Sequence, residues 1–275
     1  MRKYVLILAI MASVNANADE CPEGIVRCGT TDDGLSWEIS NIKDEKGNKS
    51  QQLTITGKGA MKDYDRHGDG QAPWKDTSLN ITNIAIGDGI TSIGSHAFED
   101  MYSVKRVSLP EGLTRIETEA FLSCNFSQID LPSSLETLAS YAFYGVPLSS
   151  IDLPEGLETI GWLSLGCNPK LLNVTIPENT VVDRRAFEDE GLNVYIQNVY
   201  CLGDNTSCQA LKNRGSMAGK VHFYQKDSNG YFYNNRWYAS PNDISTANHI
   251  KKRIYTIDEA NKVVGKVNSV KIRYR

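Results

Sequence analysis

The chain has 275 residues, 40% of them hydrophobic and 23% charged, and a formal net charge of −4 at pH 7. No apolar run reaches the about 20 residues that a membrane-spanning helix needs, so we expect no transmembrane segment. Residues 84–196 hold 6 basic and 16 acidic residues (6 − 16 = −10), whereas residues 212–275 hold 13 basic and 4 acidic ones (13 − 4 = +9), a division that indicates different partners for the two parts.

Residues 1–18 have the features of a secretory signal peptide. Arg2 and Lys3 precede an apolar run from Tyr4 to about Val14, and the small-x-small sequence Ala16-Asn-Ala18 is typical of a cleavage site. A membrane anchor is the alternative, but the apolar run is short for one. We expect a protein that is secreted, or held at the cell surface, after removal of this peptide.

Residues 19–83 are predicted to form an N-terminal cap. Two strand-like stretches, at 35–39 and 53–56, flank a polar turn at 44–48. A strand pair here would cover the open edge of the repeats that follow, because an exposed ladder end invites edge-to-edge association.

The loop from Asp63 to Asp69 resembles the start of a calcium-binding loop. It places possible oxygen ligands at alternate positions and Gly68 at the sixth, but Trp74 stands at the twelfth position in place of the bidentate glutamate. An exposed polar loop is the alternative.

A sequence pattern of two apolar pairs, the repeated phrase of this chain, recurs every 22 or 23 residues through 84–196 and defines about five units. Its clearest copies are Val107 to Ile116, Ile129 to Leu138 and Ile151 to Ile160. In each unit a short half-buried strand is stopped by Pro or Gly, and a second apolar pair is followed by Ala-Phe or an equivalent. A fixed period of this length is typical of stacked turns that bury a shared core, so we predict a β-rich repeat solenoid with short helical turns.

These units resemble those of the BspA-like leucine-rich-repeat surface proteins, which read roughly apolar-x-apolar-Pro-x-x-apolar-x-x-Ile-Gly-x-x-Ala-Phe-x-x-Cys. Cys124 fits the last position, and Cys167 is one residue out of step. Trp162 and Leu165 depart from the pattern in the fourth unit, as is common near the end of an array. The resemblance implies a leucine-rich-repeat superhelix, surface exposure, and adhesion to host proteins or other cells.

Periodicity also predicts which polar side chains share a face. The predicted contacts are the middle residues of the strands and the acidic residues of the turns: Ser108, Asp130, Asp152, Thr175, Glu111, Glu155 and Glu178. Aligned like charges repel, so a basic protein surface or a cation would relieve them. The alternative is a solvated face that keeps the protein soluble.

The six cysteines suggest two local disulfides. Cys21 and Cys28 lie seven apart before the array, and Cys201 and Cys208 lie seven apart after it, in what we expect to be an oxidising compartment. Cys124 and Cys167 belong to units two turns apart, beyond disulfide reach, and are predicted to be buried free thiols.

Residues 197–219 are predicted to cap the other end of the array, and residues 220–275 to form a small basic, aromatic α+β module. Within this module the pattern predicts strands at 221–224 and 231–238, a helix at 256–264 and a strand at 270–275. A disordered basic tail is the alternative. An anionic envelope surface, a glycan or the acidic array itself could bind it, whereas nucleic acid is not expected.

No sequence motif indicates catalysis. The four histidines His67, His96, His222 and His249 are scattered, and no phosphate loop, nucleophile elbow or Rossmann fingerprint is present. We therefore predict no catalytic residue, no metal and no cofactor. The predicted function is the binding of a protein or glycan by an exported repeat protein. The alternative is a structural envelope component attached through its basic tail.

Overall fold

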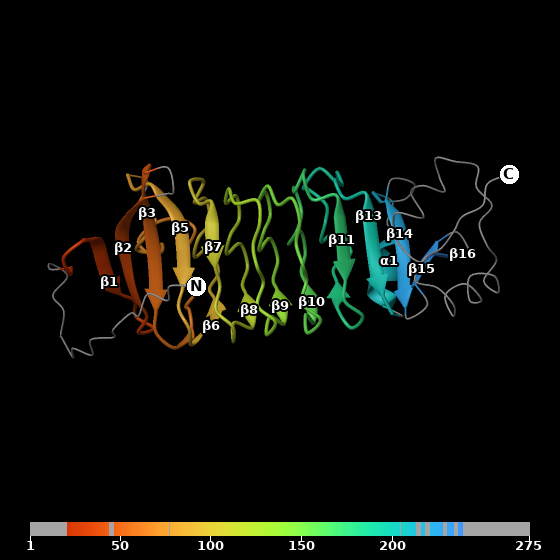
Figure 1. Cartoon of the computed structure of the whole chain (residues 1–275), viewed down its shortest axis with the longest axis horizontal. Helices are drawn as coiled ribbons and strands as arrows, with labels where there is room; N and C mark the ends of the chain where they lie inside the picture. The colour runs from red at the N-terminus through yellow and green to blue at the C-terminus, as the bar shows by residue number, and fades with distance from the viewer. Residues whose placement is uncertain are drawn as a thin grey trace.

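The computed structural model describes residues 21–238 apart from 44–46, 77, 204, 213–215, 218–220, 228–229 and 234–235. Turns of chain stack along one long axis and give an elongated solenoid (Figure 1). The predicted β-rich solenoid is thus confirmed. The predicted signal peptide at 1–18, helix at 256–264 and strand at 270–275 lie outside the described residues.

The N-terminal end is an antiparallel meander that continues into a parallel ladder. It contains β1 (Ile25–Thr30), β2 (Ser36–Lys43) and β3 (Lys49–Thr56), followed in the ladder by β5 (Ile81–Ile86) and β7 (Arg106–Ser108). Leu53, Ile84 and Val107 are in register across β3, β5 and β7, and the first two are buried. Because side chains alternate along a strand, the residues on either side of them face solvent. The ladder therefore begins at β3, inside the segment predicted to be a cap.

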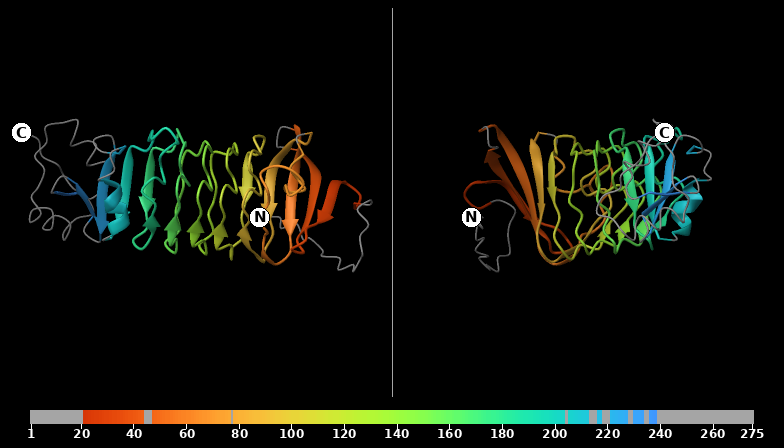
Figure 2. Two further views of the ribbon diagram at one scale, coloured as in Figure 1. Left: turned by 180° about the vertical axis from the view of Figure 1, so that it is seen from behind. Right: turned by 45° about the vertical axis from the view of Figure 1, so that its right-hand side comes forward.

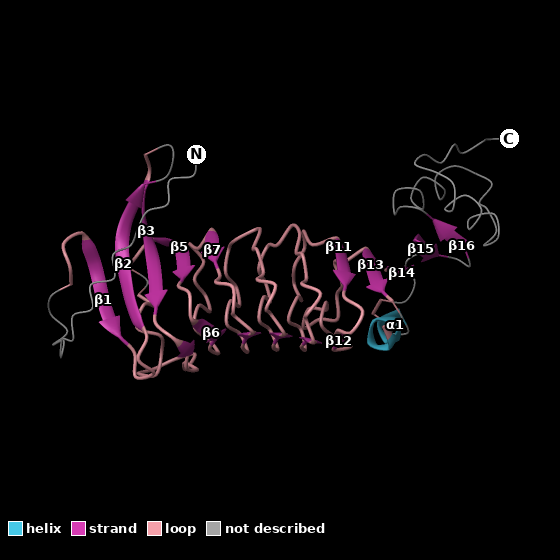
Figure 3. Ribbon diagram, turned by 60° about the horizontal axis from the view of Figure 1, so that its bottom comes forward, coloured by secondary structure: helices cyan, strands magenta, loops and turns pink. Residues whose placement is uncertain are grey.

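A second parallel sheet follows one long edge of the solenoid, at the bottom of Figure 1. Its strands, in spatial order, are β4 (Gly59–Ala60), β6 (Ile90–Ile93), β8 (Arg115–Ile116), β9 (Thr137–Leu138), β10 (Thr159–Ile160) and β12 (Val181–Val182). In the two-residue strands β8, β9, β10 and β12, the second residue is apolar and buried while the first is at least partly exposed. Figure 3 shows these short strands as one row.

The C-terminal end has a third sheet, with β11 (Asn173–Ile176), β13 (Asn198–Leu202) and β14 (His222–Asp227) parallel and β15 (Gly230–Tyr233) and β16 (Arg236–Tyr238) antiparallel. The view from behind in Figure 2 shows this sheet and α1 (Thr206–Lys212) at the end opposite β1. The buried Asn205 caps α1: its Oδ1 accepts a hydrogen bond of 2.9 Å from Cys208 N–H, and its Nδ2 donates to the carbonyls of Pro177 and Thr180.

The predicted strands of the third and fourth units are not strands in the structure. Residues 129–131 and 151–153 carry no strand pairing, although β7 and β11 occupy the equivalent place in other units. Pro132 and Pro154 follow them directly, but Pro110 and Pro177 stand at the same place after β7 and β11, so the proline limits the length of the ladder in every turn and does not account for the two unpaired segments. The continuous strand ladder is the second sheet, which contains one strand from each turn between β4 and β12. Its strands coincide with the second apolar pair of the repeat, for which the sequence predicted no strand.

A column of aromatic rings fills the interior. Phe98 and Phe121 stack with centroids 5.1 Å apart, Phe121 and Phe143 are 5.5 Å apart, and Trp74 continues the column 5.8 Å from Phe98. The Trp74 Nε1–H donates to the Ala97 carbonyl at 2.8 Å. The core therefore extends one ring beyond the phenylalanines recognised in the sequence.

Two corner positions in each turn have left-handed backbone. The first column comprises His96, Glu119, Tyr141 and Leu163, with φ between 53° and 58°, and the second comprises Asp100, Ser123, Gly145 and Cys167, with φ between 52° and 69°. Non-glycine residues rarely adopt this conformation, so its repetition shows that the stacked backbone imposes it. The corners place His96, Glu119 and Tyr141 at equivalent positions of successive turns.

The two cysteine pairs form disulfides, with Cα–Cα distances of 5.7 Å for Cys21–Cys28 and 5.9 Å for Cys201–Cys208. Cys124 and Cys167 are free. Cys124 is buried, but Cys167 is only half-buried, which differs from the prediction. It stands at a corner, and Asn168, three residues after Leu165, takes the interior place that Cys124 takes three residues after Phe121.

Candidate functional site

The seven predicted contact residues are all exposed. Ser108 lies in β7 and Thr175 in β11, whereas Asp130 and Asp152 lie in the unpaired segments between them. The three glutamates lie in the turns that follow these positions. We call this side of the solenoid, defined by β5, β7, residues 128–130, residues 150–152 and β11, the strand face.

The carboxylates of the strand face differ in their partners. Glu111 Oε2 accepts hydrogen bonds from Ser133, 3.2 Å from N–H and 3.0 Å from Oγ–H, so it is held by the next turn. In the part of the chain that the structure describes, no ion pair involves Asp130, Asp152 or Glu155. These three carboxylates are therefore available to a partner.

Some carboxylates elsewhere in the array are paired with cations. Arg115 Nε lies 2.6 Å from Glu117 Oε1, and Arg185 Nε lies 2.8 Å from the fully buried Glu188. Other exposed carboxylates of the array, such as Glu136 and Glu158, also have no ion pair among the described residues, so the strand face is one of two sides with unpaired negative charge that would attract positively charged surfaces.

A groove of about 350 Å³ crosses the N-terminal part of the strand face. Its polar lining comes from four successive turns: Gln52, Asn83, Arg106, Ser108, Gln128 and Asp130. Two of the predicted contacts, Ser108 and Asp130, thus belong to one concave site. The amides and the arginine were missed because the sequence analysis followed only the middle residue of each strand.

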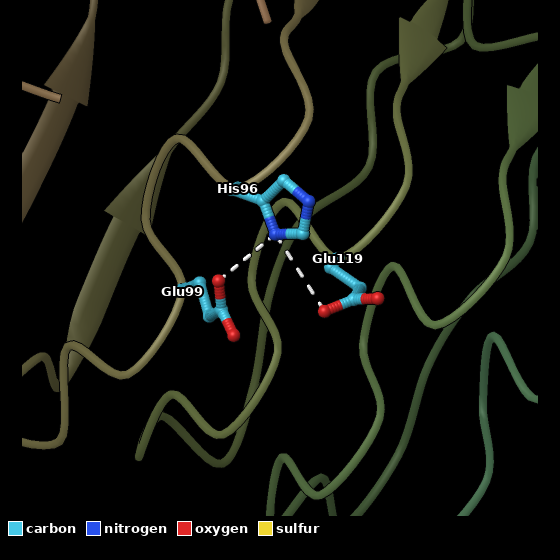
Figure 4. A group of neighbouring side chains, drawn as sticks. All are labelled: His96, Glu99 and Glu119. Carbon is cyan, nitrogen blue, oxygen red and sulfur yellow. Dashed lines mark hydrogen bonds and ion pairs between the residues drawn. The ribbon is translucent and has the colours of Figure 1, made fainter. Parts of the chain in front are cut away.

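The side of the solenoid formed by the first column of corner positions, His96, Glu119, Tyr141 and Leu163, is called the corner edge. A cluster of titratable side chains lies at its N-terminal end (Figure 4). His96 Nδ1 is 2.9 Å from Glu99 Oε2 and 3.5 Å from Glu119 Oε2. Glu99 is fully buried, and Glu119 Oε2 is a buried atom without a hydrogen-bond partner. His96 and Glu119 meet because they occupy the same corner of consecutive turns. Their spacing within the period was the signal that could have revealed them.

Two cations already neutralise this cluster. Arg66 Nε lies 2.5 Å from Glu99 Oε1 and its Nη2 lies 3.4 Å from Glu119 Oε2, while Lys75 Nζ is 3.9 Å from Glu99. The hydrogen bond to Glu99 raises the pKa of Arg66, against the smaller effect of desolvation. One imidazole and two carboxylates are a donor set that could hold a divalent cation, but with both carboxylates paired we interpret the cluster as an ion-pair network that fastens the 62–75 segment to the array.

Within the described ranges, this cluster is the one group of three His, Cys, Asp or Glu side chains close enough to share an ion. The aspartates of the 63–69 loop do not form such a group, and Asp63 Oδ1 instead accepts a hydrogen bond of 2.6 Å from Ser95 N–H. A cavity of about 430 Å³ opens beside Glu99 and is also lined by Arg66 and Tyr102.

Aromatic residues continue the corner edge toward the C-terminus. The Tyr141 ring lies 5.1 Å from that of Tyr144 and 5.0 Å from that of Trp162, and the Arg185 guanidinium lies 5.4 Å from the centre of the Trp162 ring. Burial raises the pKa of Tyr141 and of Tyr144. Trp162 is 39% exposed, so the departure from the repeat pattern noted in the sequence places an indole at the surface. Tyr, Trp and Arg are the residues most enriched at binding hot spots, which makes this edge a second candidate contact surface.

Residues 75–193 match the family model described as "BspA type Leucine rich repeat region", in six copies. This segment is similar to a BspA-type leucine-rich-repeat array. The family model counts one copy more than the five units predicted from the sequence, and it begins at residue 75, ahead of the first predicted unit.

Solved structures of bacterial leucine-rich-repeat proteins resemble the chain. One from Eubacterium ventriosum is 22% identical, with a TM-score of 0.45, over 61% of this chain and 42% of its own length. One from Bacteroides ovatus is 14% identical, with a TM-score of 0.39, over 74% of this chain and 56% of its own. This chain thus spans about half the length of these two proteins.

A leucine-rich cell surface protein from Faecalibacterium prausnitzii is 17% identical, with a TM-score of 0.24, over 67% of this chain and 72% of its own. A comparison with curated proteins finds no match. In the part of the chain that the structure describes, no helix has the length and apolar character needed to cross a membrane.

Proposed function

We propose that this is an exported, non-enzymatic protein whose BspA-type array binds another macromolecule through the strand face and acts in adhesion at a cell or host surface. The family of the array supports a role in macromolecular interaction. The signal-like sequence at 1–18 and the two end disulfides support export to an oxidising compartment.

The observation that carries the proposal is the uncompensated charge of the strand face. Asp130 and Asp152 occupy equivalent exposed positions of consecutive turns, and Glu155 follows in the adjoining turn. Neighbouring turns lie about 5 Å apart, so the two aspartates repel each other by up to about 1 kcal/mol in water. A partner that presents positive or hydrogen-bonding groups at this spacing would relieve that repulsion, and it would gain in association rate from the complementary charge.

The proposal is tested with the mature chain, residues 19–275, on immobilised mucin and extracellular-matrix proteins. The variant Asp130→Lys/Asp152→Lys should lose at least tenfold in affinity for whichever of these proteins the wild type binds. It replaces two exposed carboxylates with ammonium groups, which repel the positive groups of the partner. Biolayer interferometry at two salt concentrations measures the loss, which should shrink as salt screens the charges.

The matched control is Glu136→Lys/Glu158→Lys. Glu136 and Glu158 are also exposed and also one turn apart, but they lie beside β9 and β10 on the other edge. The net charge changes equally in the two variants, so equal loss of binding in both would show that only overall charge matters and would contradict the strand-face assignment.

A second candidate function is a structural envelope component attached through the basic C-terminal part. The excess of basic residues in 212–275 (13 − 4 = +9) favours it, since such a segment is attracted to anionic surfaces. Deleting residues 250–275 and locating the protein separates the two functions. Release into the medium supports attachment through this segment, and unchanged retention counts against it.

A further inference from the structure

The groove on the strand face is built from side chains in register. Gln52 pairs with Asn83 across β3 and β5, and Asn83 pairs with Arg106 across β5 and β7. Two residues further along the same strands, Ala85 pairs with Ser108. Since residues two apart in a strand face the same side, the long polar side chains form one wall and the small residues form a low floor beside it.

The polar groups of the groove retain free hydrogen-bonding capacity of both kinds. Gln52 donates through Nε2 to Thr54 at 3.2 Å, which leaves its Oε1 open, and Asn83 accepts through Oδ1 from Thr82 at 3.0 Å, which leaves its amide N–H groups open. Among the described residues, no ion pair holds Arg106 or the Asp130 carboxylate across the groove. Donors and acceptors therefore alternate around a single concavity.

The lining has one residue of a type enriched at protein hot spots, Arg106, and lacks the aromatic ones. Its apolar members belong to the strand interiors: Ile84 and Ile129 are buried and Val107 is half-buried. Its volume lies at the small end of the range of ligand pockets, about 300–1,000 Å³. A small ligand that offers many hydroxyls, each able to donate and to accept, matches this lining better than an apolar or aromatic anchor does.

We propose that the groove binds an oligosaccharide of a few sugar units, laid across β3, β5, β7 and residues 128–130. Neighbouring strands lie about 4.8 Å apart, which is close to the length of one sugar ring. Each turn therefore offers its polar side chain to one sugar unit of the oligosaccharide. Amides of Gln52, Asn83 and Gln128 hold the hydroxyls, and Arg106 and Asp130 close the outer rim. This inference rests on the proposed function, because it names the ligand class for part of the same face.

The test applies the labelled mature chain to an array of bacterial and eukaryotic oligosaccharides and then titrates the strongest ligand by calorimetry. Ala85→Trp fills the floor of the groove and should reduce affinity at least 100-fold. Asn83→Ala removes one hydrogen-bonding side chain and should reduce it about fivefold to tenfold. Ala85→Ser, which keeps the floor low, should stay within twofold of the wild type.

Circular dichroism and thermal melting verify that each variant folds. If Ala85→Trp does not fold, Asn83→Ala combined with Gln128→Ala at the exposed wall takes its place. Glycan binding through the neutral amides should change little between low and high salt, whereas attraction of a basic protein to the strand face should fall steeply.

The outcomes separate this inference from the proposed function. If no oligosaccharide binds while an immobilised protein binds and is lost in Asp130→Lys/Asp152→Lys, the glycan inference is overturned and the proposed function stands. Oligosaccharide binding that neither Ala85→Trp nor Asn83→Ala weakens would place the ligand elsewhere and overturn the groove. Failure of both proteins and oligosaccharides to bind would contradict the proposed function itself.

Discussion

Phe121 is the central ring of the interior column, and its replacement by alanine should destabilise the array by about 3.5–5 kcal/mol. The ring is fully buried, stacks on Phe98 and Phe143, and meets Phe126 edge-on at 5.8 Å. Burying such a side chain contributes about 1.5–3 kcal/mol. A cavity on the order of 100 Å³ adds about 2 kcal/mol at about 24 cal/mol per Å³, because stacked turns cannot close around it.

The assay is urea unfolding, followed by circular dichroism and by tryptophan fluorescence. Trp74, stacked on Phe98 in the same column, contributes to the fluorescence together with the three other tryptophans of the chain. Tyr102→Ala is the matched control, since this aromatic residue of the same array is 62% exposed and should change stability by less than about 0.5 kcal/mol. A loss below about 2 kcal/mol for Phe121→Ala would show that the turns do not depend on the column and would refute the reasoning.

Three further predictions concern buried polar groups. Asn205→Ala removes the cap of α1 and the two hydrogen bonds that Asn205 Nδ2 donates to the Pro177 and Thr180 carbonyls, so it should lower the free energy of unfolding by about 2 kcal/mol in the same urea assay; a change under about 0.5 kcal/mol would contradict the cap. Burial raises the pKa of both free thiols, so at pH 8 iodoacetamide should modify half-buried Cys167 slowly and Cys124 only after unfolding, as followed by mass spectrometry; equal rates would be inconsistent with the structure. Glu99→Gln removes the buried charge that pairs with Arg66, and because the Arg66 side chain is 48% exposed and keeps Glu119 as a partner, the loss in thermal or urea unfolding should be about 1–3 kcal/mol; a stability equal to the wild type would show that the network contributes nothing.

The period of the sequence is sufficient to predict the solenoid because every turn must bury the same positions. The apolar pair ending at Ile116 and the Ala-Phe at 120–121 recur in step, and both are interior in the structure. Trp74 was not recognised as part of the column, since its turn lacks the repeated phrase and fills the same space with an indole. The period alone did not show which of the two apolar pairs carries the continuous strand ladder.

The candidate sites were harder to predict because they depend on lateral neighbours. Asp130 and Asp152 could be placed on one face by counting, since exposure follows the same alternation in each turn. The groove instead requires Gln52, which lies outside the repeated phrase, to stand in register with Asn83. Similarly, the meeting of Arg66 with Glu99 depends on how a non-repeating loop folds back over the array, and no local pattern records that.

The direction of the strands determines how the array responds to tension. The strands run across the long axis and their hydrogen bonds run along it, so every contact between neighbouring turns carries the tension between the two ends, and the contacts can separate one at a time (Figure 1). Each turn that detaches releases 22 or 23 residues, about 75 Å of extended chain, which lowers the tension before the next turn separates. The array would therefore respond to pulling as a series of extensible links, and attachment through it could lengthen in steps without breaking.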